Sequence, residues 1–484
     1  MDLPSRERPP EHIVLRVGAR KARLVALACG GFTLACEGPV EPDACAPPTV
    51  SHATVTPVGT NVLAAIVTAD VLDGDSVSAR FGRVGEALDG ATPAYSVSQQ
   101  STIAVPVLGL RNDATYNIEL VAWNDCGSTR SSMLDHTTGS LPADLPRYTA
   151  TGTNPSPGYV AFAAGSYGVV IDNIGRIVWY HRFPNGPGLN FQPQPNGRYV
   201  ARPTPSAGQA ATWVEIDALG NTTRTLGCSG GLPSRLHDMI AAPDGSYWLM
   251  CDEVRTVDLS SYQRSTESLV MGTLIQRRGA NGDVLFEWSP FDHSSVDIGA
   301  LEAGDLSGPV INWTHGNAID LTEDGNLIVS FRNLSEVVKI DTRSGAVLWR
   351  MGGARNQFTF SNTPTPAFAR QHGVRALGAN RLQLLDNLGE RNASRSERYE
   401  VNESGKIAQL IGWHASTSGA IALIGGTAQP LRGGGTLVSF GNGASVEEFD
   451  DAGAVVWKIE GNPGYVFRAH RIRSLYTPGM GDPR

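Results

Sequence analysis

From residue 145 onward the sequence repeats one pattern, and this repeat limits the possible folds more than any other feature. In each repeat a glycine lies in a turn after an acidic or polar residue and before an apolar run, which often reaches a tryptophan. The glycines are Gly175, Gly220, Gly282, Gly345, Gly405 and Gly453, at intervals of 45, 62, 63, 60 and 48 residues. Repeats of this length with several short strands each are typical of a β-propeller. We therefore expect a six-bladed β-propeller over residues 146–476, followed by a tail at 477–484.

The stretch 313–353 shows one such unit most clearly. Asp324-Gly325 and Ser344-Gly345 separate apolar runs, which predicts tight antiparallel hairpins. His315 opens the first expected strand and Arg332 ends the second. In an antiparallel pair these two positions are neighbours. The unit is therefore expected to hold an imidazole and a guanidinium close together.

Three histidines occupy matching positions in consecutive repeats. His237, His315 and His372 precede the turn of their repeat by 7, 9 and 7 residues. In a propeller the innermost strand of each blade lines the central channel, so we expect the three imidazoles to converge at one end of that channel. A structural role explains any one of these histidines well, but it explains the set of three poorly.

The arginine indicates which chemistry this cluster would support. A planar guanidinium matches a tetrahedral oxyanion, so Arg332 beside imidazoles favours a phosphate or sulfate ester as the ligand. We expect no metal, because a zinc site would not include a neighbouring arginine, and no cofactor. A GxxxxGK[ST] phosphate loop, a GxSxG elbow and a paired-carboxylate site do not stand out in the sequence.

Residues 48–142 have a different character, with short alternating strands. The segment from Leu108 to Asn124 resembles the end of a fibronectin type III module, and Tyr116 is placed to form a tyrosine corner. We expect a small fibronectin III-like or Ig-like β-sandwich here, preceded by a linker at 37–47.

The N-terminus predicts export. Basic residues precede an apolar run, Leu24 to Ala35, that is too short to span a bilayer but fits a secretory signal, so residues 1–36 are assigned to an export segment. Cys36 and Cys29 each follow a Leu-Ala pair, so a lipid tether at either cysteine and plain signal cleavage are the alternatives. The expected location is the periplasm or the outer surface.

Two further properties bear on partners and stability. A formal net charge of -8 and a pI near 5.7 argue against a nucleic-acid partner. Four cysteines lie beyond the signal, and in an oxidising compartment pairing is the default. We predict the disulfides Cys45–Cys126 and Cys228–Cys251.

Several motifs resemble those of the bacterial arylsulfate sulfotransferases. They are Trp313-Thr314-His315-Gly316-Asn317, Ile328 to Asn333, Lys339 to Asp341 with Gly345, Trp349 to Gly353, Arg370-Gln371-His372 with Leu385 to Asn387, and Phe467 to Ile472. The resemblance covers roughly residues 146–476. It implies an exported enzyme that moves a sulfuryl group from an aryl sulfate to a phenol without a nucleotide donor.

The resemblance also implies roles for individual residues. His372 matches the family's nucleophile, which is sulfated during transfer, and His237, His315 and Arg332 match its partners. His315 is our choice for the acid and base, and Asn317 is carried over as a substrate-binding residue. Trp313 and Tyr465, with Phe467, are candidates for stacking a phenol ring, with core packing as the alternative for each, and His470 is a candidate fourth histidine at the rim. The competing interpretation of the whole chain is a non-catalytic binding propeller with a degenerate site.

Overall fold

The computed structural model describes residues 45–484 except 99, 365, 379 and 389–392. The expected export segment and Cys29 and Cys36 lie outside the described residues. Within them the fold is built almost entirely from antiparallel strands, which confirms the all-β prediction. The described helical elements are α1 (Pro290–His293) and two 3₁₀ turns at Ser229–Gly231 and Ser260–Tyr262. No helix in the described part of the chain is long and apolar enough to cross a membrane.

Two sheets form from residues 49–137 and share one hydrophobic core. The first contains β1 (Thr49–Pro57), β2 (Ala64–Leu72) and β6 (Gln100–Leu108); the second contains β3 (Ser76–Arg83), β4 (Gly90–Ala91), β5 (Tyr95–Ser96), β7 (Thr115–Asn124), β8 (Gly127–Arg130) and β9 (Leu134–Thr137). The hydroxyl of Tyr116 accepts a hydrogen bond from the backbone N–H of Arg111 at 2.8 Å. This is the contact expected of a tyrosine corner.

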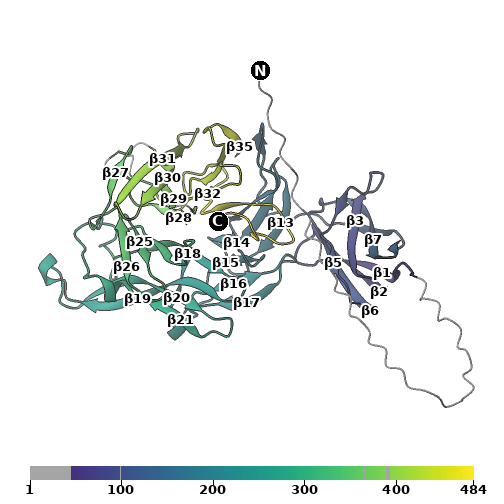
Figure 1. The fold of residues 1–484 in the computed structure, drawn as a ribbon, viewed down its shortest axis with the longest axis horizontal. Coiled ribbons are helices and arrows are strands. Elements are labelled where there is room, and N and C mark those ends of the chain that lie inside the picture. Colours follow the sequence, from purple (N-terminus) through teal and green to yellow (C-terminus); the bar gives the residue numbers. More distant parts are fainter. Residues whose placement is uncertain (1–44, 99, 365, 379, 389–392) are drawn as a thin grey trace, which may run out of the picture. The chain divides into compact units, whose positions relative to one another are not determined.

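The rest of the described chain forms six sheets of four or five strands, which Figure 1 shows around a common centre. Their strands follow in sheet order. The sheets are β13 (Ile177–Arg182), β12 (Tyr167–Ile171), β11 (Tyr159–Ala164) and β36 (Ala469–Ile472); β14 (Phe191–Pro193), β15 (Tyr199–Ala201), β16 (Trp213–Ile216) and β17 (Thr222–Leu226); β18 (Ser234–Ala241), β19 (Tyr247–Val257), β20 (Ser268–Arg278) and β21 (Val284–Trp288), with β22 (Ile311–Asn312) beside β20; β23 (Gly316–Leu321), β24 (Leu327–Phe331), β25 (Glu336–Ile340) and β26 (Val347–Met351); β28 (His372–Ala376), β29 (Arg381–Asp386), β30 (Arg395–Asn402), β31 (Ile407–Ala415) and β27 (Thr359–Ser361); and β32 (Thr427–Pro430), β33 (Thr436–Ser439), β34 (Val446–Phe449), β35 (Val455–Ile459) and β10 (Ala150–Gly152).

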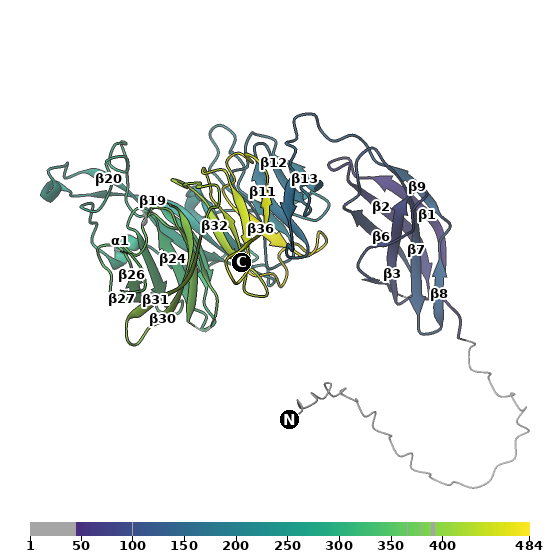
Figure 2. The same cartoon turned by 90° about the horizontal axis from the view of Figure 1, so that it is seen from above.

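The inner strands of these sheets contact one another in a ring. The order is β36, β14, β18, β23, β28 and β32, and β32 again contacts β36. Between β14 and β18 the contact is made by Asn190, whose amide donates to the carbonyls of Leu236 and His237. The two ends of the repeat region meet in one sheet, because β36 pairs with β11. Figure 2 shows β36 in yellow beside the early strands β11 and β12 in blue.

The recurring tryptophans join neighbouring sheets. The indole N–H of Trp288 donates to the carbonyl of Gly345 at 3.0 Å, in the outer turn of the next sheet. Trp179 makes the same contact with Ala218 at 2.8 Å and Trp457 with Asn173 at 2.9 Å. A buried indole usually needs a hydrogen-bond acceptor, so the Gly-turn and Trp pattern of the sequence encodes contacts between sheets.

The stretch 313–353 folds as the four predicted antiparallel strands. Gly316 is paired with Phe331, and the backbone N–H of Arg332 donates to the carbonyl of His315 at 3.1 Å. The predicted boundaries are wrong by one residue, because β23 begins at Gly316, just after His315, and β24 ends at Phe331, just before Arg332. The reason is the backbone of His315, whose φ of 48° is not that of a strand.

The predicted disulfide between Cys228 and Cys251 is present, and it links residues 23 positions apart. Cys45 and Cys126 are each disulfide-bonded as well, and their pairing with each other stays a prediction.

Candidate active site

The ring of inner strands brings the three predicted histidines together. The ring centroids of His237 and His315 are 4.8 Å apart, and those of His237 and His372 are 6.2 Å apart. Each histidine lies at or beside an interruption in the pairing of its inner strand. For His237 the interruption falls between Ser234 and Met239, and for His372 between His372 and Arg375; His315 directly precedes the interruption between Gly316 and Ala318. Interruptions of this kind turn a side chain out of its regular strand direction. Here they accompany three imidazole rings that lie close together.

The surroundings of His372 fix where its proton sits. Its Nδ1 lies 2.9 Å from Oδ1 of Asn387 and 3.1 Å from the carbonyl of Arg370. The orientation of the Asn387 amide is set by its Nδ2, which donates to the carbonyls of Ala422 and Gly425. Both partners of Nδ1 are therefore acceptors, so Nδ1 carries the proton and Nε2 keeps a lone pair. Burial lowers the pKa of His372 to about 3, so the ring is neutral at physiological pH.

His315 and His237 form a hydrogen-bonded pair, with their Nε2 atoms 3.2 Å apart. Nδ2 of Asn312 lies 2.6 Å from Nδ1 of His315 and donates to it. The proton of the neutral His315 ring is therefore on Nε2, and this N–H donates to Nε2 of His237. Burial lowers the pKa of both rings well below the usual value; the next largest causes are His315 for His237 and Arg235 for His315. The left-handed backbone of His315 is a strained conformation for a non-glycine residue, which is common at functional sites.

Arg332 adds a positive charge whose hydrogen-bond partners are neutral. Its guanidinium donates to Oδ1 of Asn333 at 2.9 Å and approaches the carbonyl of Leu423 at 3.4 Å. Among the residues that the structure describes, no carboxylate lies within ion-pair distance of it. Two other arginines nearby do have such partners, since Arg235 pairs with Asp252 and Arg370 pairs with Glu302 and Asp305. A half-buried guanidinium without a counter-ion is suited to binding an anion.

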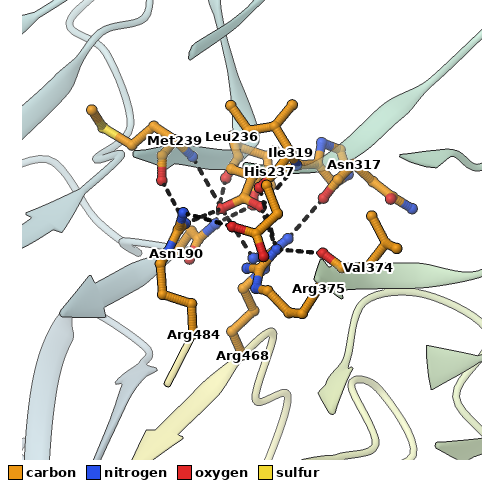
Figure 3. A network of polar contacts seen from close by, with 12 residues as sticks. Asn190, Leu236, His237, Met239, Asn317, Ile319, Val374, Arg375, Arg468 and Arg484 are labelled. Atoms are coloured by element: carbon orange, nitrogen blue, oxygen red, sulfur yellow. Dashed lines mark hydrogen bonds and ion pairs between the residues drawn. The ribbon is translucent and has the colours of Figure 1, made fainter. Parts of the chain in front are cut away.

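A second group of charges is buried next to the histidines, and Figure 3 shows its arginines converging. The carboxylate of Asp238 lies 3.0 Å from Arg375, 3.1 Å from Arg468 and 3.6 Å from Arg484. Burial acts to raise the pKa of Asp238, but the three guanidinium groups outweigh it and lower this pKa. Arg484 also reaches Asp320 at 3.5 Å. This group is largely neutralised internally.

The remaining predicted residues have different surroundings. The amide of Asn317 is buried and donates to the carbonyl of Gln371 at 2.6 Å, so it holds the backbone just before His372. Trp313 is 1% exposed in a hydrophobic cluster, with its ring 5.2 Å from that of Phe291. Core packing is therefore the interpretation that the burial of Trp313 favours over substrate stacking.

Tyr465 is 39% exposed, and its ring is 6.1 Å from Phe467, which is in turn 5.6 Å from the ring of His237. A row of aromatic rings thus leads from the surface to the imidazoles. His470, a candidate for the rim, is buried beside Arg468 and Arg375 and lies with the second charge group.

Sequence reasoning missed the residues that orient the imidazoles. Asn387 and Asn312 contact a histidine ring, and Arg468 donates to the carbonyl of Asn317; Asn387 and Arg468 lie within quoted motifs and Asn312 directly before one, but the sequence assigned none of them this role. The roles of these residues can be recognised only when the arrangement of the sheets is known. In the described part of the chain no three His, Cys, Asp or Glu side chains are grouped so that they could hold a metal ion.

Comparisons with known proteins bear on the repeat region. No protein with a curated description matches the chain. Solved structures that match the chain include a protein of unknown function from Bacteroides caccae (14% identity, TM-score 0.42, 66% of this chain and 100% of that chain). Others are an inactive variant of virginiamycin B lyase from Staphylococcus aureus with quinupristin (12%, 0.34, 64% and 87%) and a protein from Lactobacillus plantarum (12%, 0.35, 82% and 98%).

The arylsulfotransferase (ASST) family model matches residues 233–462. The match contains His237, His315, Arg332 and His372, which are the residues that the structure brings together. Residues 233–462 of the chain are thus similar to the arylsulfotransferase family.

Proposed function

We propose that the protein transfers a sulfuryl group from an aryl sulfate ester to a phenol through a sulfated His372. The observation that carries this proposal is the combination of a neutral His372 with a lone pair on Nε2 and an Arg332 that has no counter-ion among the residues the structure describes. A neutral imidazole nitrogen is a competent nucleophile, and a fixed cation beside it stabilises the charge on the sulfuryl oxygens. Both features are expected of a site that transfers an anionic group.

The first half of the reaction forms the covalent intermediate. The lone pair on Nε2 of His372 attacks sulfur, and the bond between sulfur and the aryl oxygen breaks. With the anionic ester bound, His315 takes up a second proton from solvent, and this imidazolium passes the proton on its Nε2 to the leaving phenolate. His372 keeps its proton on Nδ1, so the sulfated ring is cationic, and the acceptors Asn387 and Arg370 stabilise that charge through the Nδ1–H hydrogen bonds.

The second half regenerates the enzyme. The acceptor phenol replaces the first product, and Nε2 of His315 removes its proton as the phenol oxygen attacks sulfur. The N–S bond breaks and its electron pair returns to Nε2 of His372. Because the first product leaves before the acceptor reacts, we expect ping-pong kinetics.

We also propose the finer assignments of architecture and location. The six sheets are the blades of a six-bladed β-propeller, supported by the ring of contacts among their inner strands, and the two N-terminal sheets form a fibronectin III-like sandwich, supported by the Tyr116 contact. The disulfides support an exported protein, periplasmic or at the outer surface, with Cys36 or Cys29 as a lipid attachment site. Cys45 pairs with Cys126.

A transfer assay tests the proposed reaction. Purified protein is given 4-nitrophenyl sulfate with and without phenol, and nitrophenol is followed by absorbance. We expect release that depends on phenol and disappears in His372→Ala, while the matched variant His52→Ala, at a histidine whose side chain is 83% exposed, keeps wild-type rates. Absence of release across a panel of aryl sulfates would refute the enzyme and favour the binding propeller. Label from a sulfate-labelled donor should be found on His372, and label found elsewhere would overturn its role as the nucleophile.

A further inference from the structure

The segment between β31 and β32 exposes an unusual group of apolar side chains. Ile421, Leu423 and Ile424 are 40%, 52% and 48% exposed. Large apolar residues that are this exposed and this close together are more often part of a binding surface than of an inert one.

The backbone of this segment is attached to the candidate active site. The carbonyl of Leu423 lies 3.4 Å from the Arg332 guanidinium. Asn387, which orients His372, donates to the carbonyls of Ala422 and Gly425 at 2.9 and 3.0 Å. The exposed side chains are therefore carried by a segment anchored to the anion-binding arginine and to the residue that holds the nucleophile.

Tyr465 joins the same surface. A Cβ atom added to Gly425 would lie 2.7 Å from the Tyr465 hydroxyl and 2.9 Å from the Phe467 ring, so the absence of a side chain at Gly425 lets the segment pack directly on the aromatic row that leads to His237. The backbone N–H of Gly426 donates to the carbonyl of Phe467 at 2.8 Å. The segment that carries the three apolar side chains thus packs on the same aromatic row, from Tyr465 through Phe467, that leads to the imidazole of His237.

We propose that Ile421, Leu423, Ile424 and Tyr465 form a lip that binds the aryl group of the substrate and sets its preferred size. The inference rests on the proposed function. An aryl sulfate has an anionic end and an apolar end joined by one oxygen, so a site that binds its sulfate at Arg332 needs an apolar surface directly beside that arginine. The lip supplies this surface, and because its side chains are exposed at the rim it accommodates fused aromatic rings better than a closed pocket would.

Binding of 2-naphthalenesulfonate tests the lip without requiring turnover. Its carbon–sulfur bond blocks sulfuryl transfer, and its fluorescence or heat of binding reports affinity. The lip variant is Leu423→Ser with Ile424→Ser, and Tyr465→Ser is a second, independent variant. The matched control is Val284→Ser with Leu285→Ser, two exposed apolar residues on β21 of a different sheet.

We expect each lip variant to bind naphthalenesulfonate about tenfold more weakly, from the apolar area that it removes, and the control to bind within about twofold of wild type. Methanesulfonate, which lacks the aryl group, should compete equally weakly in all four proteins. Wild-type affinity in the lip variants, or no detectable binding to the wild-type protein, would overturn the inference.

A rate comparison separates the lip from the reaction. The ratio of kcat/KM for 4-methylumbelliferyl sulfate to that for phenyl sulfate should fall in the lip variants and stay constant in the control; an unchanged ratio in the lip variants counts against the lip. If naphthalenesulfonate binds at the lip but no aryl sulfate is turned over, the lip stands and the proposed transfer fails.

Discussion

The burial of neutral His372 predicts a loss of stability in acid that can be assigned to this one side chain. The pKa of His372 is lowered from 6.5 to about 3 by burial, whereas in the unfolded chain it is expected near 6.5. Between these two values the unfolded chain binds a proton that the folded protein does not. The free energy of unfolding therefore rises with pH across this window, and the contribution of His372 is lost progressively as the pH falls below 6.5.

The size of the effect follows from the pH interval. At pH 5, which is 1.5 units below 6.5, and at about 1.4 kcal/mol per unit, His372 lowers the free energy of unfolding by about 2 kcal/mol relative to pH 7.5. The other buried histidines add to the total loss in the wild-type protein. Replacing His372 by a side chain that cannot be protonated removes only the part of this loss that His372 causes. The difference in pH-dependent stability loss between the wild-type protein and the variant therefore measures the contribution of His372.

The test measures denaturant-induced unfolding at pH 7.5, 6 and 5 for the wild-type protein, His372→Gln and His52→Gln. The variant His372→Gln should lose about 2 kcal/mol less than wild type between pH 7.5 and 5, whatever its stability at pH 7.5. The exposed control His52→Gln should follow the wild-type pH dependence. Parallel curves for wild type and His372→Gln would refute the reasoning, because they would mean that His372 is protonated as readily in the folded protein as in the unfolded chain.

Three further predictions concern other parts of the structure. Arg332→Gln should lower kcat/KM for aryl sulfates by about 10²-fold or more, yet leave the thermal midpoint unchanged or raise it, because the arginine has no carboxylate partner in the described part of the chain; a large drop in the midpoint would show that Arg332 is structural. Asp238→Asn should cost about 3–5 kcal/mol in urea unfolding, because it removes the carboxylate shared by three buried guanidinium groups, and a near-neutral result would mean that the arginines find other partners. Cys251→Ser should cost about 2–4 kcal/mol under non-reducing conditions and nothing when both proteins are measured reduced, so equal stability without reductant contradicts a disulfide that stabilises the fold.

The sequence was informative wherever a local pattern encodes a contact between sheets. The Gly turns and tryptophans indicated the repeated sheets, and the spacing from histidine to turn placed His237, His315 and His372 together. It was less informative about Trp313, because the ring that buries it, Phe291, comes from an insertion between repeats whose path no periodicity specifies. The role of Asn387 was also hidden, since its partners are backbone carbonyls of a segment 35 and 38 residues away, and a carbonyl has no sequence signature.

The charges around the imidazoles are arranged in two groups, and the difference between them adds to burial, the main cause, in keeping the histidines neutral. In the buried group Asp238 and Asp320 offset Arg375, Arg468 and Arg484. Among the described residues no carboxylate plays this role beside Arg332, so its positive charge adds to burial in lowering the pKa of His315 and His372. An anionic ester bound at Arg332 would offset that charge and raise the pKa of the neighbouring imidazoles. In the proposed reaction, binding of the donor would therefore prepare His315 to hold the proton that the leaving group needs, and the same anion would place sulfur beside the lone pair of His372.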